Sequence, residues 1–230
     1  MTTKECCNQF TPFPQSDNAF AQAGLLMHEL LEGYANSKFY EFELAELHEQ
    51  YFDKYVQERF PYNAHASLYD GYYDGGLTYL NDFDGFGDYK ILHAEVDEYV
   101  RLGDHNLHLV IDLVLEDADG NIIIEDHKSK ASFKNKQEQK ERARQLYLYS
   151  LFIMEKYGKF PTELVFNMFR KQKIVRIPFV QDDLTEACDW ALGVVNKIQR
   201  TTEYPANPAS EFFCKEICSF KDSCTHIGGE

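Results

Sequence analysis

The segment from residue 90 to residue 129 constrains the fold most, because its apolar residues follow the period of strands and not that of helices. Two strands are predicted by the stretches KILHAEVDEYVRL and NLHLVIDLVLE. After the turn residues DADGN, a third strand is predicted by NIIIEDHKS. The turn at Gly120 would pair the second and third strands antiparallel. The chain is therefore expected to build a sheet around this hairpin.

Helices are predicted on both sides of this segment. Before it, residues 20–34 and 41–60 carry apolar side chains at the helical period, whereas the Gly-, Asp- and Tyr-rich residues 69–89 predict a loop or insertion. After it, the chain predicts one helix, a pair of strands and a last helix, over residues 135–158, 162–180 and 181–200. This order predicts an α/β or α+β fold, in which helices flank a central sheet.

Three charged residues stand out on the predicted hairpin. Asp112 lies in its first strand, Asp126 closes its second strand, and Lys128 follows two residues later, so that Asp126 and Lys128 point to the same face. Two carboxylates brought close together repel each other unless a cation neutralises them, and such oxygen ligands suit Mg²⁺ or Mn²⁺. A lysine beside the metal can orient an attacking water or offset charge on a phosphate. The alternative is an exposed hairpin end with incidental charges.

Charge is distributed unevenly along the chain. The formal net charge is −15, which by itself argues against binding a polyanion such as nucleic acid. Residues 1–127 hold 6 lysines and arginines against 25 acidic residues, whereas residues 128–230 hold 17 against 13. The basic residues begin at Lys128 and continue at Lys130, Lys134, Lys136, Lys140, Arg142 and Arg144. This run is either a solvated helix face or a local phosphate-binding patch beside an acidic site.

The sequence gives no sign of a membrane or export segment. No run of about 18 apolar residues is present, so neither a membrane-spanning helix nor a membrane partner is expected. The first residues, MTTKECCNQFTPFPQSDN, lack the basic and apolar regions of a secretory signal. We therefore expect an intracellular, cytoplasmic protein, in which stable disulfides are disfavoured.

Most of the cysteines lie near the two ends of the chain. Cys6 and Cys7 are near the start, and the end reads Cys214-x3-Cys218-x5-Cys224. This spacing is more typical of metal or cluster ligands than of disulfides. Thiolate ligation usually takes four groups, so a fourth ligand would come from elsewhere in the chain. Cys188 stands alone on a predicted amphipathic helix and is expected to pack in the core.

Taken in order, several motifs resemble the PD-(D/E)xK nuclease superfamily, and specifically its RecB-like branch. The helix GLLMHELLE matches the Gly-x-x-x-His motif of that branch, and HAEVDEYV supplies an upstream acidic position. The strands VIDLVLED and IIIEDHKSK match its metal-binding Asp strand and its Asp-x-Lys strand, and RQLYLYSL contains Gln-x-x-x-Tyr. The matching residues are Gly24, His28, Glu95, Asp112, Asp126, Lys128, Gln145 and Tyr149. The match covers about residues 20–150, and its order is more specific than any single motif.

The resemblance implies a restriction-endonuclease-like core with a central mixed sheet flanked by helices. A single nuclease domain would span residues 1–230, with its core at about residues 20–180. His28, Asp112 and Asp126 would ligate the metal, and the carbonyl of His127 is a further candidate ligand. A lone helix histidine is otherwise more often structural, and its place in this ordered series is what favours the ligand role.

The other matched residues would act on the substrate. Lys128 would serve the attacking water, and Gln145 and Tyr149 would position the substrate strand or Lys128. Glu95 would be the upstream acidic residue, although Asp97 and Glu98 lie close by. If this segment is a regular strand, Glu95 and Asp97 share a face and Glu98 points away.

The cysteines extend the resemblance. AddB-type nucleases and the CRISPR-adaptation exonucleases of this branch hold a 4Fe–4S cluster with one cysteine before the core and three after it. The trailing three would be Cys214, Cys218 and Cys224, and the leading one Cys6 or Cys7. The first trailing gap has three residues where the family usually has two, so zinc and unligated cysteines stay open. A cluster would join the tail, residues 205–226, to the N-terminal segment.

The resemblance implies a metal-dependent deoxyribonuclease, in particular an exonuclease, that acts in recombination, repair or phage DNA processing. Its partner would be DNA with single-stranded or double-stranded ends, and any helicase or recombination partner would be a separate protein. One alternative is a non-catalytic, nuclease-like subunit that binds DNA ends or a partner; intact Asp112, Asp126 and Lys128 argue against it. A redox or metal sensor built on the cysteine tail would leave the series from His28 to Tyr149 unexplained.

Overall fold

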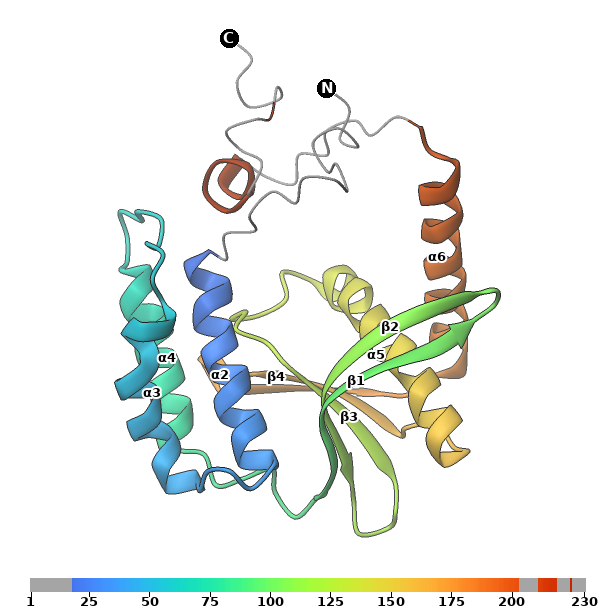
Figure 1. The fold of residues 1–230 in the computed structure, drawn as a ribbon, viewed down its shortest axis with the longest axis horizontal. Coiled ribbons are helices and arrows are strands. Elements are labelled where there is room, and N and C mark those ends of the chain that lie inside the picture. The colour runs from blue at the N-terminus through green and yellow to red at the C-terminus, as the bar shows by residue number, and fades with distance from the viewer. Residues whose placement is uncertain (1–17, 203–210, 219–223, 225–230) are drawn as a thin grey trace.

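The computed structural model describes residues 18–202, 211–218 and 224. Within these residues, one five-stranded sheet has the strand order β1-β2-β3-β4-β5, which is also the order along the chain (Figure 1). The strands are β1 (Lys90–Leu102), β2 (His105–Glu116), β3 (Ile122–His127), β4 (Glu163–Met168) and β5 (Lys173–Pro178). Neighbouring strands are antiparallel except β3 and β4, which are parallel. The predicted mixed sheet flanked by helices is confirmed.

One face of the sheet is covered by α5 (Lys136–Tyr157) and α6 (Gln181–Arg200). Parallel strands need a crossover connection, and α5 provides it between β3 and β4. Asn135 caps the start of α5, and Gly158, with φ 67°, ends it in the left-handed conformation. The core on this face joins strand residues such as Ile124 and Phe166 to both helices, and Cys188 packs against it as predicted.

The other side of the sheet faces a layer of three helices, α2 (Ala19–Ala35), α3 (Glu41–Tyr55) and α4 (Leu68–Asn81), which stand beside one another in Figure 1. Their shared core includes five leucines and a buried aromatic ring, namely Leu26, Leu30, Leu31, Leu44, Leu80 and Phe52. Of these helices, α2 contacts both β1 and β2. It is therefore the helix that can bring a side chain to the central strands.

The prediction of a loop over residues 69–89 is wrong in its first part, because residues 68–81 form α4. Ser67 caps this helix by accepting a hydrogen bond from the N–H of Asp70 at 3.1 Å. The glycines that favour a loop let α4 approach its neighbours: a Cβ on Gly76 would lie 2.6 Å from His48 Nε2 of α3. Tertiary packing therefore outweighs the weak helix propensity of the segment. The preceding helix, α3, ends at Tyr55, whereas the prediction placed its end at residue 60.

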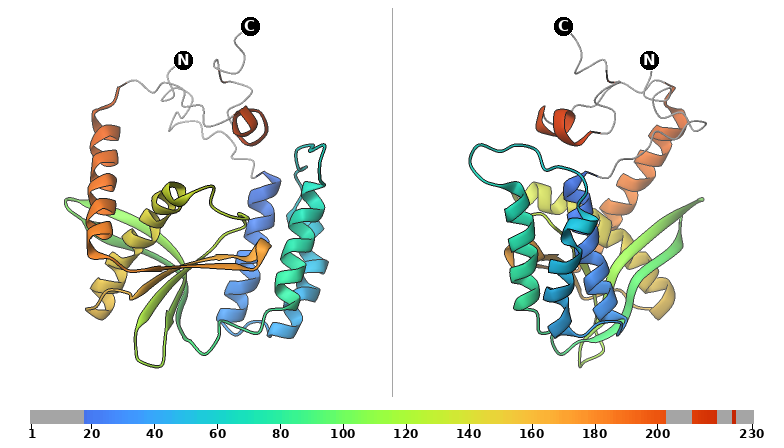
Figure 2. Two further views of the ribbon diagram at one scale, coloured as in Figure 1. Left: turned by 180° about the vertical axis from the view of Figure 1, so that it is seen from behind. Right: turned by 60° about the vertical axis from the view of Figure 1, so that its left-hand side comes forward.

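Strand β2 has two halves with different neighbours. Its inner half pairs with β3 from Leu113 to Glu116, whereas its outer half pairs only with β1. The outer half of the β1–β2 hairpin extends toward α6 (Figures 1 and 2), and a Cβ on Gly103 at its tip would lie 3.5 Å from Leu192 of α6. Before Leu113, β2 therefore has β1 and not β3 as its paired neighbour. None of the described helices is long and apolar enough to cross a membrane.

Candidate active site

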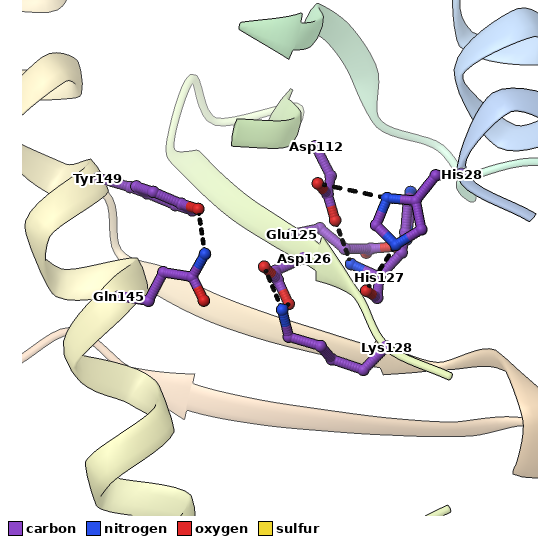
Figure 3. A network of polar contacts seen from close by, with 8 residues as sticks. All are labelled: His28, Asp112, Glu125, Asp126, His127, Lys128, Gln145 and Tyr149. Atoms are coloured by element: carbon purple, nitrogen blue, oxygen red, sulfur yellow. Dashed lines mark hydrogen bonds and ion pairs between the residues drawn. The ribbon is translucent and has the colours of Figure 1, made fainter. Parts of the chain in front are cut away.

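Asp112 and Asp126 lie at the point where β2 leaves β3. The last residue pair of this ladder is Leu113 with Glu125, so Asp112 and Asp126 occupy the next position on the two strands. Asp112 Oδ2 accepts a hydrogen bond of 2.6 Å from the backbone N–H of His127 (Figure 3). The Asp112 side chain thus satisfies a backbone donor of β3 where the ladder stops. The structure brings the two carboxylates together, as the hairpin pattern predicts.

Lys128 is held against Asp126. Its Nζ lies 2.7 Å from Asp126 Oδ2 and donates a hydrogen bond of 2.9 Å to Oδ1. Asp126 is 2% exposed, and burial raises the pKa of its carboxyl; the ammonium of Lys128 opposes this rise and the charge of Asp112 adds to it. The backbone N–H of Lys128 donates to the carbonyl of Asn167 on β4 at 2.8 Å. The lysine is thereby fixed at both its backbone and its ammonium.

His28 reaches this pair from α2. Its Nδ1 lies 3.5 Å from Asp112 Oδ1, and its Nε2 lies 3.0 Å from the carbonyl oxygen of His127. Burial lowers the pKa of His28, but the hydrogen bond and charge of Asp112 outweigh burial, so the pKa is raised. Burial raises the pKa of the Asp112 carboxyl, but the hydrogen bond and charge of His28 have the larger combined effect, so this pKa is lowered. The two side chains therefore favour each other's charged form.

Glu95 is the third carboxylate near the site. The pairs on either side of it, Ala94 with Leu113 and Val96 with Ile111, place Glu95 across from Asp112. Burial raises the pKa of Glu95, and the negative charge of Asp112 raises it further. The backbone of Glu95 has φ 51°, in the left-handed region, so β1 is not a regular strand at this residue. The expectation that Glu95 and Asp97 share a face assumed a regular strand and therefore does not hold.

The two neighbours of Glu95 in sequence are placed differently. Asp97 is exposed and its Oδ1 lies 2.6 Å from His108 Nε2 on the outer half of β2. Glu98 is also exposed and pairs in register with Leu109. Of the three acidic candidates, Glu95 is the one whose charge interacts with both Asp112 and His28.

Gln145 and Tyr149 face the two aspartates from α5. Gln145 Nε2 donates a hydrogen bond to the hydroxyl of Tyr149, and Figure 3 shows both side chains projecting toward Asp126 and Lys128. Burial raises the pKa of Tyr149, and the negative charges of Asp126 and Asp112 raise it further. Tyr149 therefore stays protonated at neutral pH, and it offers a neutral donor on the side of the site opposite His28.

A buried polar network behind β3 was not predicted. Asn167 Nδ2 donates to Glu125 Oε1 at 3.1 Å and to the Tyr79 hydroxyl at 2.7 Å, and Glu125 Oε1 lies 3.6 Å from His127 Nδ1. Burial raises the pKa of Glu125 to about 7 and lowers the pKa of His127 to about 4. The one available signal was strand alternation, which puts Glu125 and His127 on the face opposite Asp126. No local pattern marks Asn167.

The donors at this site fit a divalent cation. Two carboxylates and the His127 carbonyl are the hard oxygen ligands that Mg²⁺ and Mn²⁺ prefer, and His28 stands beside them. Asp126 Oδ2 is buried and, although it lies in the ion pair with Lys128, it receives no hydrogen bond. In the described part of the chain, no three His, Cys, Asp or Glu side chains are placed so that they could hold a metal ion. Asp112, Asp126 and the His127 carbonyl would therefore leave part of the coordination of Mg²⁺ or Mn²⁺ to water.

The cysteine tail is described only in part. Cys214 lies in the helical turn Phe213–Ile217, Cys218 follows it, and these two residues and Cys224 carry free, half-buried thiols. Cys6 and Cys7 lie outside the described residues, as do most of residues 205–226. Among the residues that are described, no three such ligands converge. Both the cluster and the packing of the tail on the N-terminal segment stay predictions.

A family model, described as the PD-(D/E)XK nuclease superfamily, matches residues 7–225 of this chain. The matched range contains His28, Glu95 and the whole segment from Asp112 to Tyr149. No curated protein matches the chain at a significant level.

Proposed function

The chain belongs to the PD-(D/E)XK nuclease superfamily, and we propose that it is an active, metal-dependent deoxyribonuclease. Members of this superfamily are typically phosphodiesterases and commonly use Mg²⁺ or Mn²⁺. The observation that carries the proposal is the buried Asp126, paired with Lys128 at 2.7 Å and adjacent to Asp112. A buried carboxylate such as that of Asp126 is costly, and a chain that only bound DNA would have no need of it.

Each residue has a role that its position supports. Asp112 and Asp126, with the His127 carbonyl, would hold the cation, and His28 would be a further ligand or would orient Asp112. When bound, the cation would neutralise negative charge on the phosphate and favour formation of the attacking hydroxide. Lys128 would donate to the attacking water and so orient it, and its ammonium would also offset the charge that develops on the phosphate.

The residues on the α5 side would bind the substrate. Gln145 and the protonated Tyr149 are neutral hydrogen-bond donors, which suit a phosphate without adding charge. Their mutual hydrogen bond fixes both side chains before substrate arrives. Glu95, across from Asp112, would restrain the cation or a water on the β1 side of the site.

The finer parts of the proposal concern substrate, partner and tail. We propose exonuclease action on DNA ends in recombination, repair or phage DNA processing, in the cytoplasm, with any helicase as a separate protein. We also propose that Cys214, Cys218 and Cys224, with Cys6 or Cys7, hold a 4Fe–4S cluster or zinc. Measurement of iron and zinc in anaerobically purified protein tests whether these cysteines bind a cluster or zinc. A Cys218→Ser variant should lose the bound metal.

A non-catalytic subunit is the second candidate, and the net charge of −15 is the observation that favours it, because this charge repels DNA unless a partner supplies basic surface. Its signature would be metal-independent, salt-sensitive binding of DNA ends without cleavage.

The experiment that separates the two candidates is a cleavage assay. End-labelled linear DNA and circular DNA are incubated with the protein in Mn²⁺, Mg²⁺ or EDTA, beside Lys128→Ala. Lys159→Ala is the matched control, because Lys159 contacts the Gly120 carbonyl beyond the far end of α5. Metal-dependent loss of linear DNA in the wild type and in Lys159→Ala, but not in Lys128→Ala, supports the enzyme, and surviving circles support an exonuclease. No cleavage in any metal would leave only the binding subunit.

A further inference from the structure

A groove of about 500 Å³ opens beside the candidate active site, between the outer half of β2, α5 and α6. Gln145 and Tyr149, which face the two aspartates, also line it, so it adjoins the site. His108 and Leu109 line it from β2, and Trp190 lines it from α6. Figure 1 shows α5 beside α6 and the β1–β2 hairpin reaching toward α6. We call this groove the Trp190 groove.

Positive charge lines the α5 wall of the Trp190 groove. Arg142 and Arg144 both contribute to the lining, with Glu141 as an opposing acid. The Arg144 side chain is only 24% exposed, and its buried Nε has no hydrogen-bond partner among the described residues. Its NH2 lies 3.7 Å from Glu186 Oε1, which neutralises it in part. A buried guanidinium N–H that lacks an acceptor is suited to an anionic ligand such as a phosphate.

An exposed aromatic ring completes the groove. Trp190 is 45% exposed, although the neighbouring α6 residues Ala187 and Ala191 are buried in the core. The guanidinium of Arg144 lies 5.2 Å from the centroid of the Trp190 ring, within cation–π range. An exposed ring beside a cation is the arrangement on which the bases of single-stranded nucleic acid stack.

We propose that the Trp190 groove binds one nucleotide of a single DNA strand, adjacent to the phosphate that is cleaved. The base would stack on Trp190, and Arg144 would contact a phosphate of the same strand. In a duplex the bases stack on one another and offer no free face, so the groove selects a single-stranded end. The tip of the β1–β2 hairpin approaches α6, because a Cβ on Gly103 would lie 3.5 Å from Leu192. This inference rests on the proposed nuclease function and specifies its substrate.

The ring itself provides the test, because Trp190 is the one tryptophan of the chain. Oligothymidylate is titrated into the Lys128→Ala protein with Mg²⁺, so that the DNA stays intact. Tryptophan fluorescence is recorded beside anisotropy of the labelled oligonucleotide. Saturable quenching is expected with oligothymidylate, and none with an abasic strand of equal length or with a blunt duplex. Saturated anisotropy without quenching would overturn the inference. Absence of oligothymidylate binding would also overturn the inference, whereas the proposed function is decided by the cleavage assay.

Variants then separate substrate binding from chemistry. Trp190→Ala should weaken oligonucleotide binding by about tenfold, within the range for loss of one base-stacking ring, and Trp190→Phe should restore most of it. Val194→Ala, one turn along α6 and also exposed, is the matched control and should bind normally. Bis(4-nitrophenyl) phosphate, which has no base, serves as a second substrate, and Val194→Ala should hydrolyse it at the wild-type rate. If the wild type cleaves DNA but Trp190→Ala binds oligonucleotide normally, only this inference fails; if the wild type hydrolyses neither substrate, the proposed function fails.

Discussion

The backbone N–H of His127 donates a 2.6 Å hydrogen bond to Asp112, across the point where β2 leaves β3. The two oxygens of Asp112 therefore make different contacts, because Oδ2 accepts this hydrogen bond while Oδ1 lies 3.5 Å from His28 Nδ1. The hydrogen bond to Oδ2 needs only an oxygen acceptor. The ion pair with His28, and the binding of a cation, need the negative charge of the carboxylate.

Asp112→Asn tests this division, because an amide oxygen can still accept the N–H of His127 but carries no charge. We expect the fold to survive and the Mn²⁺-dependent cleavage rate to fall by about 100-fold or more, since replacing even an outer partner of a metal ligand costs about 10- to 100-fold. Initial rates across a Mn²⁺ titration, with circular dichroism for folding, provide the measurement. Asp97→Asn is the matched control, because Asp97 contacts His108 and is exposed. Equal rates for Asp112→Asn and wild type would remove Asp112 from the site.

The central site was largely predictable because it is local in the sequence. Asp112 and Asp126 are joined by a single hairpin, and strand period with the turn at Gly120 is enough to place them near each other. His28 is different, since 99 residues separate it from the His127 carbonyl that it contacts. Its place in the site could be expected from the ordered resemblance and not from any local pattern.

The remaining features depend on tertiary contacts. The left-handed backbone of Glu95 has no signal in HAEVDEYV, and it makes the strand irregular where regularity was assumed. Asn167 meets Glu125 through the parallel pairing of β3 with β4, and nothing in either strand specifies that pairing. The α4 helix forms because Gly76 lets it pack closely on His48. The low helix propensity of glycine, taken alone, predicts a loop at this position.

Two glycines of α4 give opposite predictions for the same substitution. Gly76→Ala should lower the free energy of unfolding by about 1–3 kcal/mol, because its Cβ would lie 2.6 Å from His48 Nε2 and 3.0 Å from Met27 Sδ. Gly71→Ala, in the same helix with open space around it, should instead raise the free energy of unfolding by roughly 0.5–1 kcal/mol. Urea unfolding of both variants checks this. Equal effects would mean that residues 68–81 do not pack as this helix.

His48 predicts a pH dependence of stability. Its ring is fully buried, neither nitrogen has a hydrogen-bond partner among the described residues, and burial lowers its pKa from 6.5 to about 4. As pH falls from about 6.5 to 4, the unfolded chain takes up a proton here that the folded chain does not. The free energy of unfolding should therefore decrease over this interval, by up to about 3 kcal/mol from this residue.

The variant His48→Leu isolates this contribution, because other groups that titrate in the same interval, such as Glu125, are present in both proteins. Urea midpoints at pH 7.5, 6, 5 and 4.5 should decline less steeply for His48→Leu than for wild type. Parallel curves for the two proteins would mean that His48 is not buried in its neutral form.

The backbone at Glu95 gives the last prediction, because the site depends on how β1 presents this residue across from Asp112. Glu95 has φ 51°, which glycine adopts without strain, whereas Glu98 lies in the regularly paired part of β1. Glu98→Gly should lower the free energy of unfolding by about 1 kcal/mol, since glycine weakens an ordinary strand position. Glu95→Gly should cost clearly less or should stabilise, because relief of the left-handed strain offsets the entropy of glycine. Urea unfolding at pH 7.5 compares the two directly, and a larger loss for Glu95→Gly would show that β1 is regular at this position.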